Sequence, residues 1–141
     1  MAAGAMMMTG AWKEKRYIAQ VHVGPGCGCC HAWVEHLRNA KRFDVTVVEE
    51  QDIGALKRKA GVPAPLSSCH TALIAGYVIE GHVPAIDILR LVEGRSSTII
   101  GIAAPGMPVG SPGMEVASGR KEEFEVLAFD KASTVTVFAR Y

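Results

Sequence analysis

The stretch YIAQVHVGPGCGCC, residues 17–30, joins a predicted strand to a dense group of thiols. The pattern of Tyr17–Val23 is typical of a strand, and the GPG that follows at 24–26 ends it. Three of the chain's four cysteines then fall within the four residues CGCC, 27–30. A cysteine that is buried for its bulk gains nothing from two others beside it, whereas a soft metal ion or a dithiol–disulfide couple needs several sulfur atoms within bonding reach. We therefore expect metal or redox chemistry at this point of the chain.

Helix and strand patterns alternate after this stretch. Apolar residues at helical spacing, valine-rich runs and Gly or Pro breaks separate the segments. The expected segments are, in order, a helix from Cys30 or His31 to Ala40, a strand Phe43–Glu49, a helix Ile53–Ala60, the hairpin strands Thr71–Ala75 and Val78–Glu80, a helix Ala85–Glu93, a strand Ile99–Ala103, an irregular loop Pro105–Glu115, and a closing hairpin of Phe124–Asp130 and Thr134–Ala139.

The order β-α-β-α-β-β-α predicts an α/β fold. A crossover helix joins the first two strands, which should therefore be parallel and connected in the right-handed sense. This order is that of a thioredoxin-like domain, here followed by a C-terminal β extension. We expect one such domain over residues 17–141, because 141 residues with 49% apolar side chains suffice for one core.

Composition excludes several classes of function. The net charge of +1 argues against nucleic-acid binding, and no apolar run approaches the ~18 residues that span a bilayer. Residues 1–16 are small, rich in Met and then charged, and they lack the basic-then-apolar order of an export signal. We expect them to be a disordered leader or residues added for expression.

The predicted topology brings a second group of ligands to the CGCC segment. Cys69 and His70 come directly before the third strand, which runs antiparallel and so starts at the sheet edge where the first strand ends. The fourth strand returns to that edge and ends near His82. We therefore expect residues 27–30, Cys69, His70 and His82 to converge.

Two functions fit this convergence. Cys27 and Cys30 have the CxxC spacing of a thiol–disulfide oxidoreductase and form the candidate redox pair. Thioredoxin-like oxidoreductases, however, place a proline immediately before the third strand, where Cys69 or His70 stands here. The exchange of a docking proline for potential ligands favours a metal-binding protein over an enzyme.

The charge and softness of the donors favour Cu(I). Three or four thiolates around one zinc ion leave excess negative charge, and the consecutive Cys29 and Cys30 cannot easily point at one tetrahedral ion. Cu(I) accepts two or three sulfur ligands and lets one thiolate bridge two ions. We therefore predict several Cu(I) ions, with zinc as the alternative.

Four motifs in this order closely resemble one family of proteins: CGCCxxWxxHL at 27–37, SCHTA at 68–72, GYVIEGHVPA at 76–85 and PGMPVGSPGME at 105–115. The family is that of uncharacterised domain 411, which includes the CopG copper-resistance proteins. The resemblance implies a thioredoxin-like fold, a periplasmic setting with a cytoplasmic one as the alternative, and sequestration or relay of Cu(I) in copper resistance. It implies copper ions and other copper-handling proteins as partners. It also implies a set of metal ligands, which are Cys27, Cys29, Cys30 and Cys69.

Four further residues are secondary candidates for metal ligands. Met107 and Met114 carry thioether sulfurs suited to Cu(I), although either could simply fill space under a long loop. His70 could bind metal or cap backbone groups, because successive residues of a strand point to opposite faces. His82 could likewise be a ligand or a helix cap.

Overall fold

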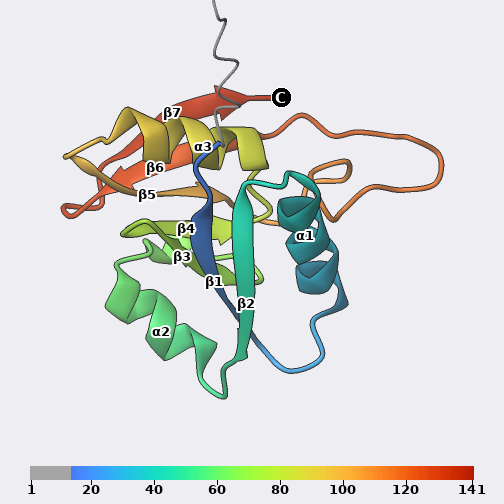
Figure 1. The fold of residues 1–141 in the computed structure, drawn as a ribbon, viewed down its shortest axis with the longest axis horizontal. Helices are drawn as coiled ribbons and strands as arrows, with labels where there is room; N and C mark the ends of the chain where they lie inside the picture. Colours follow the sequence, from blue (N-terminus) through green and yellow to red (C-terminus); the bar gives the residue numbers. More distant parts are fainter. Residues whose placement is uncertain (1–13) are drawn as a thin grey trace, which may run out of the picture.

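The computed structural model describes residues 14–141, which form one mixed sheet with three α-helices (Figure 1). The sheet order is β2-β1-β3-β4-β5-β6-β7. The strands are β1 Tyr17–Val23, β2 Phe43–Glu49, β3 Thr71–Ile74, β4 Tyr77–Gly81, β5 Ile99–Ala104, β6 Glu125–Asp130 and β7 Val135–Arg140. The helices are α1 Gly28–Asn39, α2 Ile53–Ala60 and α3 Ala85–Gly94, with a single 3-10 turn, η1, at Ala64–Leu66.

Strand pairing follows from the chain order. β1 and β2 are parallel across the α1 crossover, while β1 pairs antiparallel with β3 and β3 with β4. β4 and β5 are parallel across α3, and β5, β6 and β7 form an antiparallel extension. The predicted α/β class is confirmed, and the elements occur in the predicted order. The assignment to the thioredoxin-like group stays a prediction.

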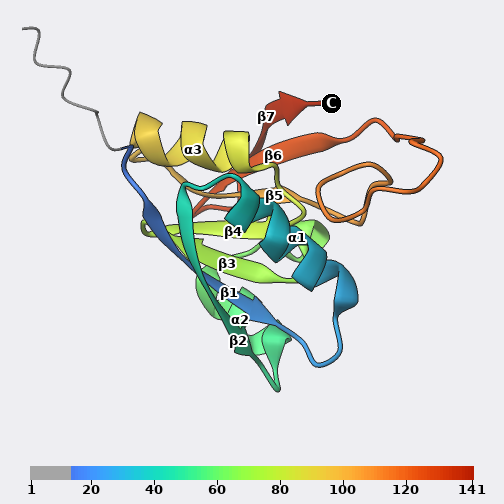
Figure 2. The same ribbon diagram turned by 45° about the vertical axis from the view of Figure 1, so that its right-hand side comes forward.

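The helices cover both faces of the sheet, with α1 and α3 on one face and α2 on the other (Figure 2). The main core lies under α1 and α3, where Trp33, Leu37 and Ile88 are 0% exposed. A smaller cluster on the α2 side is built around Val62, Leu66 and Phe129. No helix of the described residues is long and apolar enough to cross a membrane.

The first helix begins earlier than predicted. It starts at Gly28, with Cys27 as its N-cap, rather than at Cys30 or His31. Gly and Cys have low helix propensity, which is why the CGCC segment resembles a loop in sequence. In the structure, burial overrides propensity, because Cys30 continues the apolar stripe of α1 by one turn towards the N-terminus and is 0% exposed. Cys29 and Cys30 are therefore in the first turn of the helix.

The ranges of β1, β2 and α2 are as predicted, and the remaining boundaries differ from prediction by at most one residue. Most of the predicted leader lies outside the described residues, which begin at Glu14. The last residue of that segment, Arg16, is already tied to the fold, since its guanidinium bonds to Asp44 Oδ1 at 2.7 Å. The division at residue 17 stays a prediction.

Candidate metal and thiol site

Three sulfur atoms gather at the sheet edge where β1 ends. Cys27 and Cys29 come from the start of α1, and Cys69 comes from the segment that leads into β3. The three Sγ atoms lie within 4.8 Å of one another, and all three residues are partly buried. The Sγ atoms of Cys27 and Cys29 are 3.5 Å apart, and those of Cys29 and Cys69 are 3.7 Å apart. Segments 40 residues apart in sequence thus form one thiol cluster.

The fourth cysteine, Cys30, is linked to this cluster by a disulfide bond. Cys30 is 0% exposed and forms a disulfide with Cys27, with a Cα–Cα distance of 5.4 Å. Cys29 and Cys69 are free. The structure therefore holds one closed CxxC pair beside two thiols, and all four sulfur atoms belong to one site.

Two opposing effects act on the protonation of the thiols in the cluster. The amino-terminal end of α1 has a partial positive charge and no acidic residue in its first turn, so it favours negative charge on nearby sulfur. Burial is the main factor that raises the pKa of the Cys69 thiol, and the hydrogen bond with Cys29 adds to it. The positive charge of Lys57 lowers that pKa, but by less. The raised pKa favours the protonated thiol of Cys69, and a metal ion that binds this sulfur must displace the proton.

His70 follows Cys69 in the chain, and its ring is neutral and buried. It is 0% exposed, and its ring centroid is 4.3 Å from that of Trp33 and 5.1 Å from that of His82. Desolvation is the main factor that lowers the pKa of His70, to about 3. Neither ring nitrogen has a hydrogen-bond partner among the described residues. A buried polar atom without a partner costs about 1–3 kcal/mol. In the neutral ring one of these nitrogens carries a proton and the other an electron pair, so the ring offers one donor atom to a metal ion.

His82 is held by the long loop rather than by a helix. Its Nδ1 lies 2.7 Å from the Pro112 carbonyl oxygen, which can only accept, so Nδ1 carries the proton. Its Nε2 then has a free electron pair, is buried and lacks a partner among the described residues. The structure brings the rings of His70 and His82 together, but neither belongs to the group of ligand atoms within 4.8 Å of one another that the cysteines form. Their role as metal ligands stays a prediction.

The two methionines of the loop differ in exposure. Met107 is 52% exposed, whereas Met114 is partly buried. The loop itself lies close to the site, because the Ser68 hydroxyl donates to the Gly106 carbonyl at 2.7 Å. A Cβ on Gly113 would be 2.8 Å from the Trp33 backbone nitrogen, so the loop also touches α1. Whether either thioether binds metal stays a prediction.

One polar contact near the site has no clear signal in the sequence. His36 on α1 accepts a hydrogen bond from the Ala85 backbone N–H at 3.0 Å, at the amino end of α3. Burial lowers the pKa of His36, so the ring stays neutral and can accept. Its place in the motif at 27–37, on the partly buried side of the α1 pattern, is the signal that could have drawn attention to it.

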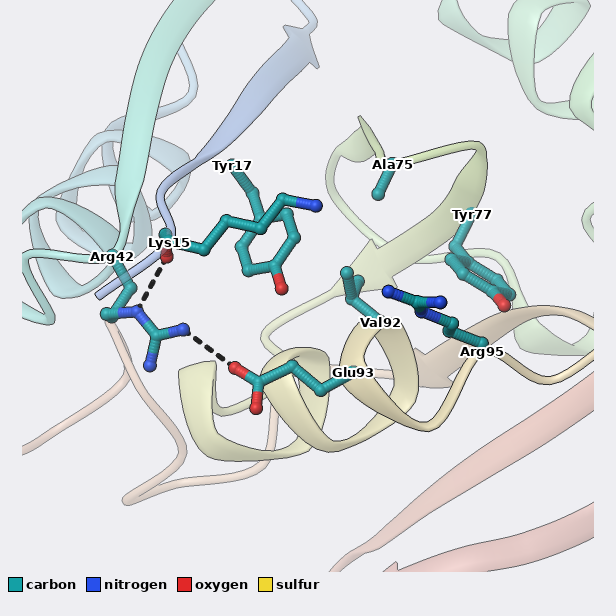
Figure 3. Close-up of a pocket in the computed structure, with 8 residues that line it drawn as sticks. All are labelled: Lys15, Tyr17, Arg42, Ala75, Tyr77, Val92, Glu93 and Arg95. Carbon is teal, nitrogen blue, oxygen red and sulfur yellow. Dashed lines mark hydrogen bonds and ion pairs between the residues drawn. The ribbon is translucent and has the colours of Figure 1, made fainter. Parts of the chain in front are cut away.

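A pocket lies at the other end of β1, and its chemistry differs from that of the thiol cluster (Figure 3). It encloses about 520 Å³ and is lined by Lys15, Tyr17, Arg42, Ala75, Tyr77, Val92, Glu93 and Arg95. An ion pair of 2.7 Å between Arg42 and Glu93 closes one side. It contains no sulfur or imidazole ligand. The candidate site is therefore the thiol cluster.

Comparison with known proteins agrees with the motifs. Residues 66–114 match the model of a family described as a protein of unknown function, DUF411. The structure "Copper resistance protein copG- Form 2" is 42% identical, with a TM-score of 0.83, over 90% of this chain and 99% of that chain. The "Form 1" structure is 44% identical, with a TM-score of 0.81, over 88% of this chain and 96% of that chain. No curated protein matches this chain.

Proposed function

This chain belongs to the DUF411 family of the copper resistance protein CopG, and on that premise we propose that it binds Cu(I) through Cys27, Cys29, Cys30 and Cys69. The observation that carries the proposal is the cluster of three sulfur atoms within 4.8 Å, contributed by two distant segments. In this proposal the protein sequesters or relays copper in copper resistance, with other copper-handling proteins as its partners. A periplasmic setting is part of the same proposal and rests on the family resemblance.

The geometry of the donors supports Cu(I) over zinc. Consecutive residues of a helix point about 100° apart, so Cys29 and Cys30 face different directions. Cys30 is directed into the core, whereas Cys29 is directed towards Cys69. Sulfur atoms that face different directions cannot easily all bind one tetrahedral zinc ion. Each Cu(I) ion needs only two or three of them, and one thiolate can bridge two Cu(I) ions. Several monovalent ions would also balance the charge of four thiolates.

Copper binding can be tested by anaerobic titration of the reduced protein with Cu(I) against a competing chelator. We expect thiolate-to-copper charge-transfer absorption and tight uptake. The double variant C29S/C69S should lose at least about 100-fold in affinity, since loss of a residue that merely supports a ligand typically costs 10–100-fold.

The matched control is H31Q, which changes an exposed residue directly after Cys30 in the same helix. It should bind copper like the unchanged protein. Equal affinity in C29S/C69S would rule out the cluster as the copper site. Zinc that is retained through purification and competes with Cu(I) would favour the zinc alternative.

The closed disulfide supports a second candidate function, thiol–disulfide exchange. Cys27 is partly exposed, while Cys30 is 0% exposed, so a partner can reach only the Cys27 sulfur. In the reduced protein the Cys27 thiolate would attack a partner disulfide and release one partner thiol. Cys30 would then attack the Cys27 sulfur and release the second thiol. Two electrons pass to the partner, and Cys27 and Cys30 end as the disulfide.

This reaction assigns different roles to the two cysteines, which makes it testable. In a C29S/C69S background, which removes the two neighbouring free thiols, a C30A variant should accumulate the mixed disulfide between Cys27 and the partner, whereas C27S should form none. Mass spectrometry after mixing reduced protein with a model disulfide distinguishes them. Equal trapping in both variants, or no reaction in the reduced protein, would count against the oxidoreductase.

A further inference from the structure

A buried ion pair lies beside the segment that carries Cys69, and the proposed function does not use it. Glu80 on β4 is 0% exposed and Lys57 on α2 is 7% exposed. Lys57 Nζ lies 2.6 Å from Glu80 Oε2. Burying two charges is costly, and an apolar pair of similar volume is often as stable or more so. Stability alone therefore explains this pair poorly.

Glu80 binds the chain on both sides of Cys69. Its Oε2 accepts a hydrogen bond from the Ser68 backbone N–H at 2.7 Å. Its Oε1 accepts one from the Thr71 hydroxyl at 2.5 Å. Thr71 and Glu80 are direct partners in the antiparallel register of β3 and β4, so their side chains share a face of the sheet. One carboxylate thus contacts the residue before Cys69 and the residue two positions after it.

The Ser68 contact replaces a hydrogen bond that the sheet does not provide. β3 begins at Thr71, so Ser68 lies before the strand. Next along the chain, the His70 carbonyl accepts from the Gly81 N–H at 3.0 Å. The backbone contact between this segment and β4 ends at His70, and the Glu80 carboxylate adds a further contact at Ser68. The segment is therefore bound to β4 on both sides of Cys69.

Lys57 supplies the counter-charge of this arrangement. Its ammonium also donates to the Thr71 hydroxyl at 2.9 Å, so the three side chains form a closed network. Removal of Glu80 or Lys57 alone would leave an unpaired charge in the protein interior. A test of their role must therefore change both residues together.

We propose that Glu80 is a positioning residue, which holds the Cys69 sulfur opposite Cys29 through the Ser68 N–H, with Lys57 as its counter-ion. The separation that it maintains is the 3.7 Å between the two sulfur atoms. The consequence for copper affinity rests on the proposed function, whereas the placement of the sulfur atoms does not. If the network served stability alone, every folded variant would place Cys69 equally well.

The placement can be measured without metal. In a C27S/C30A background, Cys29 and Cys69 are the only cysteines. Equilibration with glutathione joins these two thiols in a disulfide, while one oxidised glutathione takes up their two electrons and two protons and becomes two reduced ones. The equilibrium constant is the effective concentration of one thiol towards the other, which reports their mutual placement.

Two double variants in this background isolate the hydrogen bond to Ser68. E80Q/K57M and E80L/K57M both remove the buried charges, but only the glutamine keeps an oxygen that can accept from the Ser68 N–H. We expect E80Q/K57M to keep the effective concentration and E80L/K57M to lower it about tenfold, the factor that corresponds to one net hydrogen bond. The matched control D87N alters another buried carboxylate, on α3, and should leave the effective concentration unchanged.

Circular dichroism first establishes that each variant is folded. If E80L/K57M is not, E80M/K57M decides, because the unbranched methionine side chain is closer in shape to glutamate and likewise cannot accept from the Ser68 N–H; it should lower the effective concentration about tenfold. Equal constants in E80Q/K57M and the folded apolar double variant, or an equal fall in D87N, would overturn the proposal.

A Cu(I) titration of the same substitutions with all four cysteines present separates this proposal from the proposed function. If the copper site is real, E80L/K57M should bind Cu(I) more weakly than E80Q/K57M. If the unchanged protein binds no Cu(I) while the glutathione constants still differ, the proposed function fails and the positioning role of Glu80 stands.

Discussion

At the scale of single residues, His70 links the stability of the fold to pH. Its buried ring is neutral in the folded protein, where its pKa is about 3, against an ordinary value of 6.5. Between these values the unfolded chain binds a proton that the folded chain does not. The contribution of His70 is therefore fully present above about pH 6.5 and is lost as the pH falls towards 3.

We expect the metal-free protein to lose stability below pH 6.5, at up to about 1.4 kcal/mol per pH unit for one proton. Burial also lowers the pKa values of His36 and His82, so their contributions have the same sign. Urea unfolding at a series of pH values measures the slope. The variant H70L, which cannot be protonated, should have a smaller slope, whereas H31Q at an exposed position should not. An unchanged slope in H70L would contradict this account.

Residue types alone predicted the thiol cluster but not its supports. Cysteines are rare, and their spacing around predicted strand ends indicated which of them would meet. Lys57, Glu80 and His36 carry no such signal, because charged residues and histidines are common on exposed faces. Their roles depend on burial, and burial follows from the packing of α2 and α1 on the sheet. Sequence spacing does not provide that information.

At the scale of elements, the loop after β5 is held against α1 at one glycine. Gly113 has a φ of +87°, and a Cβ there would be 2.8 Å from the Trp33 backbone nitrogen and 3.1 Å from His82 Nδ1. Gly119 has a similar φ of +74°, but nothing lies within 4 Å of its Cβ position. Substitution of Gly119 therefore tests backbone strain alone, whereas substitution of Gly113 tests strain together with the close contact to α1.

We expect G119A to destabilise the protein by about 1 kcal/mol, the cost of the left-handed conformation. G113A should cost about 1–3 kcal/mol more, because the loop must also move away from α1. Urea unfolding monitored by tryptophan fluorescence measures both. Equal losses in the two variants would mean that the contact between loop and helix is not tight.

Element boundaries were predicted well where local signals were strong. The range Ile53–Ala60 was predicted correctly, because Gly61 ends that helix in a left-handed conformation, with φ of 84°. The start of α1 was placed too late, because CGCC lacks helix propensity and only its packing makes it helical. This difference matters for function, since it puts Cys29 and Cys30 on a rigid element rather than in a loop.

At the scale of the whole molecule, the two proposed activities use the same sulfur atoms. Cys27 is a member of the thiol cluster and also half of the disulfide. With the disulfide closed, the four-cysteine site has two free thiols, and with the disulfide open it has four. Chain order alone predicted this convergence, because β1, α1 and the approach to β3 meet at one sheet edge. The CxxC spacing named Cys27 and Cys30 as the candidate redox pair, and these are the two cysteines that the disulfide joins.

Copper loading and disulfide formation should therefore exclude each other. When oxidised glutathione is added to the Cu(I)-loaded protein, Cys27 and Cys30 give up two electrons and form the disulfide, and two reduced glutathiones appear. Because two thiolate ligands are lost, we expect the protein to release at least part of its Cu(I), which a chromogenic chelator detects. Re-reduction should restore the capacity. The variant C27S/C30A cannot form this disulfide and should show no release tied to it. Full copper retention by a protein whose Cys27–Cys30 disulfide has formed, verified by mass spectrometry, would place the copper outside the cluster.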